Sequence, residues 1–168
     1  MTLLKKLSFL LAGLFSVCVL ASCNSTNFKT AGFKNVDFSK EQKIHVVTKD
    51  FAYNILVSYN SYGSFTMRFI DEVPKTLEDV SVEFVNDACT IKTEYLEHTV
   101  SVDMLTMEFF PLVLYKFFSV TDFNSVQWEF NEAENICFFE TSVSGKVVVF
   151  SASKALEAKE QIYMIEIK

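Results

Sequence analysis

The stretch MEFFPLVLYKFFSV, at residues 107–120, decides how the rest of the chain is interpreted. Drawn as an α-helix, it gathers its largest apolar side chains on one side, namely Phe110, Leu114, Phe117 and Phe118. Pro111 suits the first turn of such a helix. Because a membrane span needs about 20 apolar residues, we expect this shorter helix to be buried within the domain. Two roles remain open for it: a core helix, or a helix that lines or plugs an apolar ligand cavity.

The chain around this stretch alternates between apolar and polar residues, which is typical of β-strands with one buried face. In residues 64–70, Phe65, Met67 and Phe69 fall on one face and Arg68 falls on the other. The same alternation recurs in residues 80–84, 99–103 and 126–130. Three further runs are apolar on both faces and predict strands that are covered on both sides: residues 55–57, 136–139 and 147–150.

Turn-forming residues separate the predicted strands. They are Asn60 to Gly63, Asn86-Asp87 and Ser144-Gly145. Residues 161–168 predict a closing strand. The pattern therefore predicts about nine antiparallel strands and one helix, which is a mainly β (α+β) fold.

The first residues have the three-part plan of a secretory leader. Lys5 and Lys6 form a basic start, and residues 7–20 contain no charge. The sequence Leu20-Ala21-Ser22-Cys23 follows and resembles the bacterial lipobox. That resemblance implies cleavage before Cys23 and attachment of lipid to its thiol. The alternative is an ordinary signal peptide that happens to contain a cysteine.

This interpretation divides the chain into a leader (residues 1–22), a lipid-attached tether (residues 23–33) and one domain (residues 34–168). We expect the domain at the extracytoplasmic face of the cell membrane. The resemblance implies the outer membrane if the cell has two membranes, since Asn24 would permit that sorting. Two acyl chains hold a protein at a membrane for long periods, whereas one holds it only weakly.

The amino-acid composition of the chain limits the kinds of molecule that it can bind. The formal net charge is −6, and loss of Lys5 and Lys6 with the leader makes it −8. An acidic domain is repelled by nucleic acid and by anionic lipid headgroups, so we expect no nucleic-acid partner. Of the 18 phenylalanines, 16 remain after the leader is removed. Since each can bury about 150–250 Å², we expect a large core or a cavity lined with rings.

The order of predicted elements resembles the Lol-type lipoprotein carriers, LolA and LolB. The matching parts are the strand Gly63 to Phe69, the turn Pro74 to Leu77, the strand Val80 to Phe84 and the apolar helix. The resemblance implies an antiparallel sheet curved as a half-barrel, with the helix packed against its concave face. It also implies an apolar cavity for acyl chains. The leading helix of that family is not evident in residues 33–43.

The sequence contains no recognised catalytic motif: no Gly-x-Ser-x-Gly, His-Glu-x-x-His, Cys-x-x-Cys or phosphate loop. His45 and His98 lie in strand-like segments, where a histidine is more often a surface or hydrogen-bonded residue than a metal ligand. Arg68 could pair with a ligand headgroup, although a cross-strand ion pair is the simpler role. We therefore expect no enzyme activity, no cofactor and no metal.

Cys89 and Cys137 are the cysteines that remain beyond Cys23. Outside the cytoplasm such a pair can form a disulfide. Both also sit in strand-like apolar runs, where cysteine serves as a small hydrophobic residue, so the two roles stay open.

Two functions fit these observations. The first is a lipid-anchored domain whose cavity binds acyl chains of lipid or lipoprotein. Its predicted lining residues are Phe65, Met67, Phe69, Phe110, Leu114, Phe117, Phe118 and Trp128. The second is an envelope structural or protein-interaction module with a filled core and no small ligand.

The lipobox makes a direct prediction. Cys23→Ala removes the thiol that would carry the lipid, so the variant should stay uncut by the lipoprotein signal peptidase and should not incorporate labelled palmitate. Labelling of wild-type and variant chains in cells checks this. Undiminished labelling of the variant would contradict the assignment.

Overall fold

Most of the predicted domain is described by the structure, which is a computed structural model. It describes residues 37–60, 62–71, 73–154 and 161–168. The predicted leader (residues 1–22), Cys23 and the tether (residues 23–33) lie outside the described residues.

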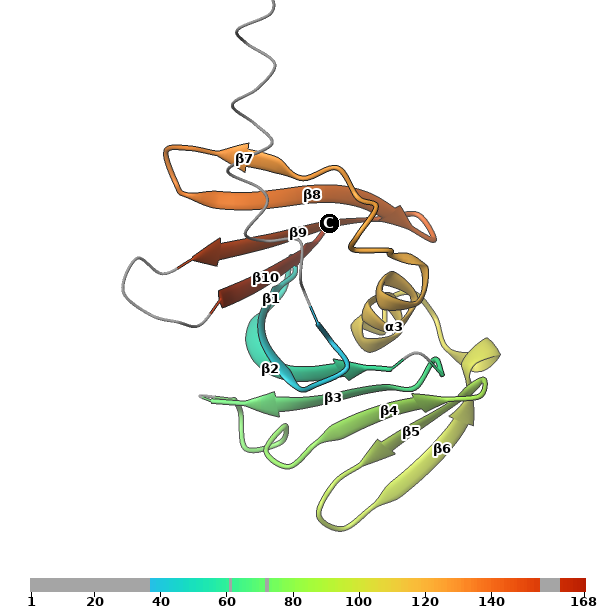
Figure 1. The fold of residues 1–168 in the computed structure, drawn as a ribbon. Helices are drawn as coiled ribbons and strands as arrows, with labels where there is room; N and C mark the ends of the chain where they lie inside the picture. Colours follow the sequence, from blue (N-terminus) through green and yellow to red (C-terminus); the bar gives the residue numbers. More distant parts are fainter. Residues whose placement is uncertain (1–36, 61, 72, 155–160) are drawn as a thin grey trace, which may run out of the picture. The chain divides into compact units, whose positions relative to one another are not determined.

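The described chain is mainly β (Figure 1). Six strands come first: β1 (Gln42–Val47), β2 (Ala52–Tyr59), β3 (Phe65–Ile70), β4 (Ser81–Val85), β5 (Ala88–Lys92) and β6 (Glu97–Ser101). A short 3-10 helix, η2 (Val102–Met104), and the α-helix α3 (Phe110–Val120) follow. Four strands complete the chain: β7 (Glu129–Asn131), β8 (Ile136–Val143), β9 (Lys146–Lys154) and β10 (Gln161–Ile167). The prediction of a mainly β fold with one apolar helix is confirmed.

All ten of these strands belong to one open sheet, in the order β6-β5-β4-β3-β2-β1-β10-β9-β8-β7. Two meanders, β1 to β6 and β7 to β10, meet where β1 lies beside β10. This junction is parallel and aligns Ile44 with Tyr163 and Val46 with Ile165. The prediction of a purely antiparallel sheet was therefore wrong at this junction. The reason is that α3 carries the chain from one meander to the other, so the second meander returns with its last strand beside the first strand.

The tight turns form where the sequence predicts them. Asn86 and Asp87 join β4 to β5 with φ values of 48° and 63°, and Ser144 and Gly145 join β8 to β9 with 49° and 87°. Positive φ at both central residues matches the right-handed twist of the two strands that such a turn connects. In the turn between β2 and β3, Gly63 has a φ of 77°.

Two predicted elements are shorter in the structure. The helix begins at Phe110, with Pro111 in its first turn, and residues 107–109 lie outside it. The predicted strand at residues 126–130 is reduced to β7, because its partner β8 pairs only with Glu129–Asn131. Val126 to Trp128 instead belong to the loop that leads from α3 to β7.

The turn between β8 and β9 offers a test of the fold. Nothing lies within 4 Å of a Cβ added at Gly145, whose φ is 87°. Gly145→Ala should therefore destabilise the domain by about 1–2 kcal/mol through backbone strain alone. Gly145→Asn should cost less, because asparagine tolerates this conformation. Urea denaturation of both variants measures the difference, and equal costs would contradict this account.

Candidate functional site: the sheet face covered by α3

One face of the sheet is apolar over almost its full width. The strand register aligns one residue from each of seven neighbouring strands in a single row: Phe69, Ile55, Ile44, Tyr163, Ala152, Cys137 and Phe130. A second row across β6 to β2 contains Val100, Cys89, Phe84, Phe65 and Tyr59. Because side chains alternate between the faces of a strand, the polar residues of β3 to β5 fall on the opposite face, whereas His98 of β6 pairs with Ile91 and falls on the apolar side. We call the apolar side the inner face.

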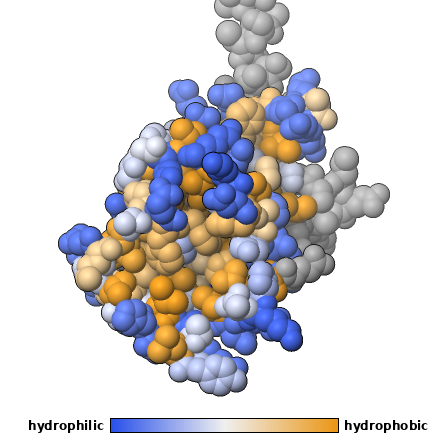
Figure 2. All heavy atoms as spheres, turned by 180° about the vertical axis from the view of Figure 1, so that it is seen from behind, coloured by the Kyte–Doolittle hydropathy of each residue, from blue (hydrophilic) through white to orange (hydrophobic). Residues whose placement is uncertain are grey.

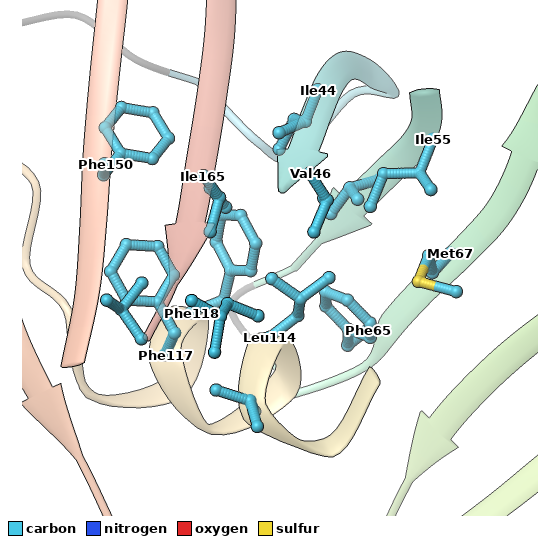
Figure 3. Close-up of a cluster of buried hydrophobic side chains, with 14 of the residues drawn as sticks. Ile44, Val46, Ile55, Phe65, Met67, Leu114, Phe117, Phe118, Phe150 and Ile165 are labelled. Atoms are coloured by element: carbon cyan, nitrogen blue, oxygen red, sulfur yellow. The ribbon is translucent and has the colours of Figure 1, made fainter. Parts of the chain in front are cut away.

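The helix α3 packs on this inner face through its aromatic rings (Figure 3). The ring centroid of Phe118 lies 5.7 Å from that of Phe65 on β3 and 6.3 Å from that of Tyr59 on β2. Phe117 reaches the other meander, with ring centroids 6.1 Å from Phe139 on β8 and 6.0 Å from Phe150 on β9. One helix therefore contacts both meanders.

A further ring of α3 contacts the first meander. Tyr115 stacks almost parallel to Phe84 of β4, with centroids 4.6 Å apart. The buried residues of α3 are Pro111, Leu112, Val113, Leu114, Phe117 and Phe118. The helix is thus apolar on most of its circumference.

The structure brings the predicted cavity residues together in one cluster. Phe65, Met67, Leu114, Phe117 and Phe118 are buried, whereas Phe69, Phe110 and Trp128 are half-buried at its border. Phe69 of β3 and Phe110 of α3 lie 6.0 Å apart between ring centroids. All eight pack against other apolar side chains, so the space beneath α3 holds protein atoms.

Trp128 lies at the side of β8 and β9. Its ring meets Phe139 and Phe150 edge to face, at centroid distances of 5.0 and 5.8 Å. Its Nε1 is buried, and no hydrogen-bond acceptor contacts it among the described residues. A buried donor without an acceptor costs about 1–3 kcal/mol, so an oxygen atom placed beside Nε1 would be favoured.

Sequence reasoning missed several rings of the cluster. Phe150 and Phe139 lie in the runs 147–150 and 136–139 that are apolar on both faces, and this signal could have assigned them to the inner face. Phe38 precedes β1, and Phe123 follows α3, so neither belongs to a periodic pattern. Their ring centroids nevertheless lie 5.2 Å apart, and that of Phe38 lies 4.7 Å from that of Phe118.

Of the two roles open for Cys89 and Cys137, the structure does not contain the disulfide, since both cysteines are free and buried. They lie on β5 and β8, which six other strands separate in the sheet order. Burial raises the pKa of each thiol above its ordinary value, so both stay protonated near neutral pH. A protonated thiol is a poor nucleophile and a poor metal ligand, and the alternative role as small hydrophobic residues fits.

Ionisable groups lie mainly outside the inner face. Arg68 forms an exposed ion pair with Glu41, with Nη2 3.1 Å from Oε2. Arg68 therefore has the ion-pair role that the sequence favours. Its partner, however, precedes β1 and does not lie on a strand adjacent to β3. His45 Nδ1 lies 3.0 Å from Asn54 Oδ1, and His98 is exposed on β6, so one histidine is hydrogen-bonded and the other lies at the surface.

Two tyrosines bring hydroxyl groups to the border of the cluster. Burial is the main cause that raises the pKa of Tyr59, and the electrostatic effect of the nearby Tyr115 adds to it. Burial is also the main cause that raises the pKa of Tyr163, and the negative charge of Asp37 adds to it. Both phenols therefore stay neutral near pH 7, and Ser151 is the one polar or charged residue that is buried in the described part of the chain. Such a surface can bind apolar groups.

Neither a metal site among the described residues nor a known relative assigns a function to the inner face. Across residues 37–60, 62–71, 73–154 and 161–168, no three His, Cys, Asp or Glu residues gather in a way that could hold a metal ion. Among the helices described, none has the length and apolar character required to cross a bilayer. No family model, curated protein or solved structure matches the chain.

The packing of α3 makes a quantitative prediction. Phe117 is 0% exposed, so Phe117→Ala should destabilise the domain by about 3–5 kcal/mol through lost burial and the cavity it leaves. Val120 of the same helix is 69% exposed, and Val120→Ala should change stability by less than about 0.5 kcal/mol. Chemical denaturation of both variants checks this, and similar small effects would mean that α3 does not cover the sheet.

Proposed function

We propose that this chain is an extracytoplasmic lipoprotein, anchored to a membrane through lipid on Cys23, that binds acyl chains of a lipid or lipoprotein without catalysing a reaction. The observation that carries the proposal is that a sheet face, apolar across seven strands, is covered by one helix of 11 residues. The proposed binding site lies between α3 and this inner face.

We also propose that the sheet curves as a half-barrel with α3 on its concave side. Tyr115 contacts Phe84 on β4, and Phe117 contacts Phe139 on β8. These two strands are six spacings apart in the sheet order, which is about 29 Å in a flat sheet at ~4.8 Å per spacing. An α-helix with its side chains is only about 10–12 Å wide. The contacts on both sides, and the strands arranged around α3 in Figure 1, therefore support a curved sheet.

The way α3 is held supports its role as a plug that a ligand displaces. At the N-terminal end, Phe109 makes no side-chain hydrogen bond to the helix backbone, and at the C-terminal end the backbone N–H of Thr121 donates to the carbonyl of Phe117. Apolar packing beneath Leu114, Phe117 and Phe118 is thus its main attachment. An acyl chain offers the sheet the same kind of contact, so it can replace part of the packing between α3 and the inner face.

Trp128 supplies a polar position for such a ligand. Its buried Nε1 lacks an acceptor among the described residues, and the carbonyl oxygen of an ester or carboxyl group could accept this hydrogen bond. Apolar pockets with a few placed polar groups are typical of small-molecule sites. The proposal therefore places the acyl chain under α3 and its carbonyl end beside Trp128.

Displacement of a fluorescent fatty acid from residues 28–168 tests the function. We expect saturable micromolar binding. Since Trp128 is the one tryptophan in the chain, its emission should change in parallel. Phe118→Ala should raise the affinity several-fold by removing a ring beneath α3, whereas Leu114→Phe should lower it by filling the same space. The melting temperature of each variant shows whether it is folded.

A specific observation also favours the second function, an interaction module with a filled core. The buried apolar residues form one continuous cluster, and the predicted cavity residues belong to it. Apolar side chains also reach the surface in the reverse view, where hydrophilic residues border them (Figure 2). Absence of fatty-acid binding by both the wild-type domain and Phe118→Ala would favour this second function.

A further inference from the structure

We infer that the outer edge of β6 pairs with β6 of a second copy of this chain, in an antiparallel arrangement centred on Thr99. This inference is independent of acyl binding, because it concerns the edge of the sheet and not its inner face. It begins with position: β6 is the last strand on its side of the sheet. Glu97, His98, Thr99 and Ser101 are all exposed.

Within the part of the chain that the structure describes, β6 directs backbone groups away from its one neighbour, β5. At one end of the β5–β6 hairpin, the N–H of Thr93 donates to the carbonyl of Leu96, and at the other the N–H of Val102 donates to the carbonyl of Asp87. Hydrogen-bonded pairs alternate along an antiparallel ladder, so Thr99 opposite Thr90 is a pair without backbone bonds. The N–H and C=O groups of Thr99, and likewise of Glu97, therefore point away from β5.

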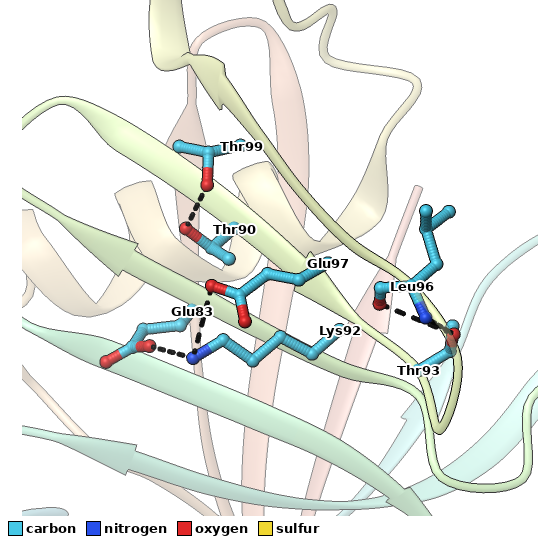
Figure 4. A network of polar contacts seen from close by, with 7 residues as sticks. All are labelled: Glu83, Thr90, Lys92, Thr93, Leu96, Glu97 and Thr99. Carbon is cyan, nitrogen blue, oxygen red and sulfur yellow. Dashed lines mark hydrogen bonds and ion pairs between the residues drawn. The ribbon is translucent and has the colours of Figure 1, made fainter.

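The usual protections of an edge strand are weak here. Natural edges are often blocked by lysine, proline or a bulge, and the segment Glu97–Ser101 contains none of these. Its acidic residue is compensated in part, because Lys92 Nζ lies 3.8 Å from Glu97 Oε1 while it also lies 3.5 Å from Glu83 Oε2 (Figure 4). The lysine thus lowers the negative charge that the edge presents to a strand that approaches it.

Charge selects the register of the pair. With Thr99 opposite Thr99 of the second copy, Glu97 lies opposite Ser101 and His98 lies opposite Val100, so no like charges face each other. Centring the pair one residue earlier would place His98 opposite its own copy. Centring it one residue later would place Glu97 opposite Asp103.

The selected register also continues features already present within one copy. On one face, Thr90 Oγ1 and Thr99 Oγ1 lie 3.0 Å apart (Figure 4), and the second copy would extend this threonine row across the junction. On the other face, Leu96 is 65% exposed and would approach Val102 of the second copy. A leucine that is exposed on one copy would thus gain an apolar neighbour, which supports a second copy as the partner.

Crosslinking of the full chain in membranes tests the pairing. In the proposed dimer, the two Thr99 positions are one strand spacing apart, about 5 Å, whereas the two Thr90 positions are three spacings apart, about 14 Å. Thr99→Cys should therefore form a covalent dimer with a bis-maleimide reagent that spans about 8 Å, at least five-fold more than Thr90→Cys. The wild-type chain gives the background, because Cys89 and Cys137 are buried. Labelling with a monofunctional maleimide corrects for unequal thiol reactivity.

A second pair of variants separates pairing from folding. Thr99→Lys places two ammonium groups opposite each other, so native mass spectrometry of the lipidated chain should show loss of dimer. Thr99→Ser keeps the backbone donor and a hydroxyl, so its dimer should remain, and both variants should melt within a few degrees of the wild type. Equal crosslinking at positions 90 and 99, or a Thr99→Lys chain that dimerises like the wild type, would overturn the inference.

Discussion

The parallel contact between β1 and β10 is the constraint on which the rest of the structure depends. Each meander can form its own hairpins from local turns, but neither can cover its apolar side alone. Where Ile44 and Val46 lie beside Tyr163 and Ile165, the two apolar sides become one face. Only then does a single helix have strands of both meanders within reach of its rings. The proposed site, its filled interior and the positions of the free edges all follow from this junction.

The sequence predicts what is decided locally. Alternation identifies β3 and β4 because each has one buried side, and the turns at Asn86-Asp87 and Ser144-Gly145 are specified by the backbone freedom of those residues. The buried helix is evident because few residues of α3 are polar. Seven of the eight predicted cavity residues come from the helix or from the alternating strand β3, and both give periodic signals.

Contacts between distant segments leave no such signal. Nothing in the pattern of residues 42–47 distinguishes an antiparallel neighbour from a parallel one, so the junction with β10 was missed. Phe38 and Phe123 enter the cluster from loops, where no period marks a buried side. Residues 126–128 do alternate, but a strand needs a partner in register, and β8 supplies one only from Glu129 onward. The choice between the two roles of Cys89 and Cys137 stayed open for a related reason, since sequence spacing does not reveal which strands lie side by side.

The chemistry of the inner face is uniform, and this limits what it can do. The thiols of Cys89 and Cys137 and the phenols of Tyr59 and Tyr163 all have raised pKa values because burial disfavours their charged forms. A surface made of neutral groups discriminates between ligands by shape and volume more than by charge. Any selectivity of the proposed site would thus depend on a few polar atoms at its border, of which Trp128 Nε1 is the best defined.

The β1–β10 junction also has a consequence for how the chain folds. Its partners, such as Ile44 and Tyr163, are more than a hundred residues apart in sequence. Proteins dominated by such distant contacts fold slowly, because the entropy of closing a long loop is lost before the contacts form and offset it. Until β10 arrives, the apolar sides of β1 to β6 are covered incompletely and can associate with other chains. A chain of this topology therefore depends on protection of its first meander until its last strand is in place.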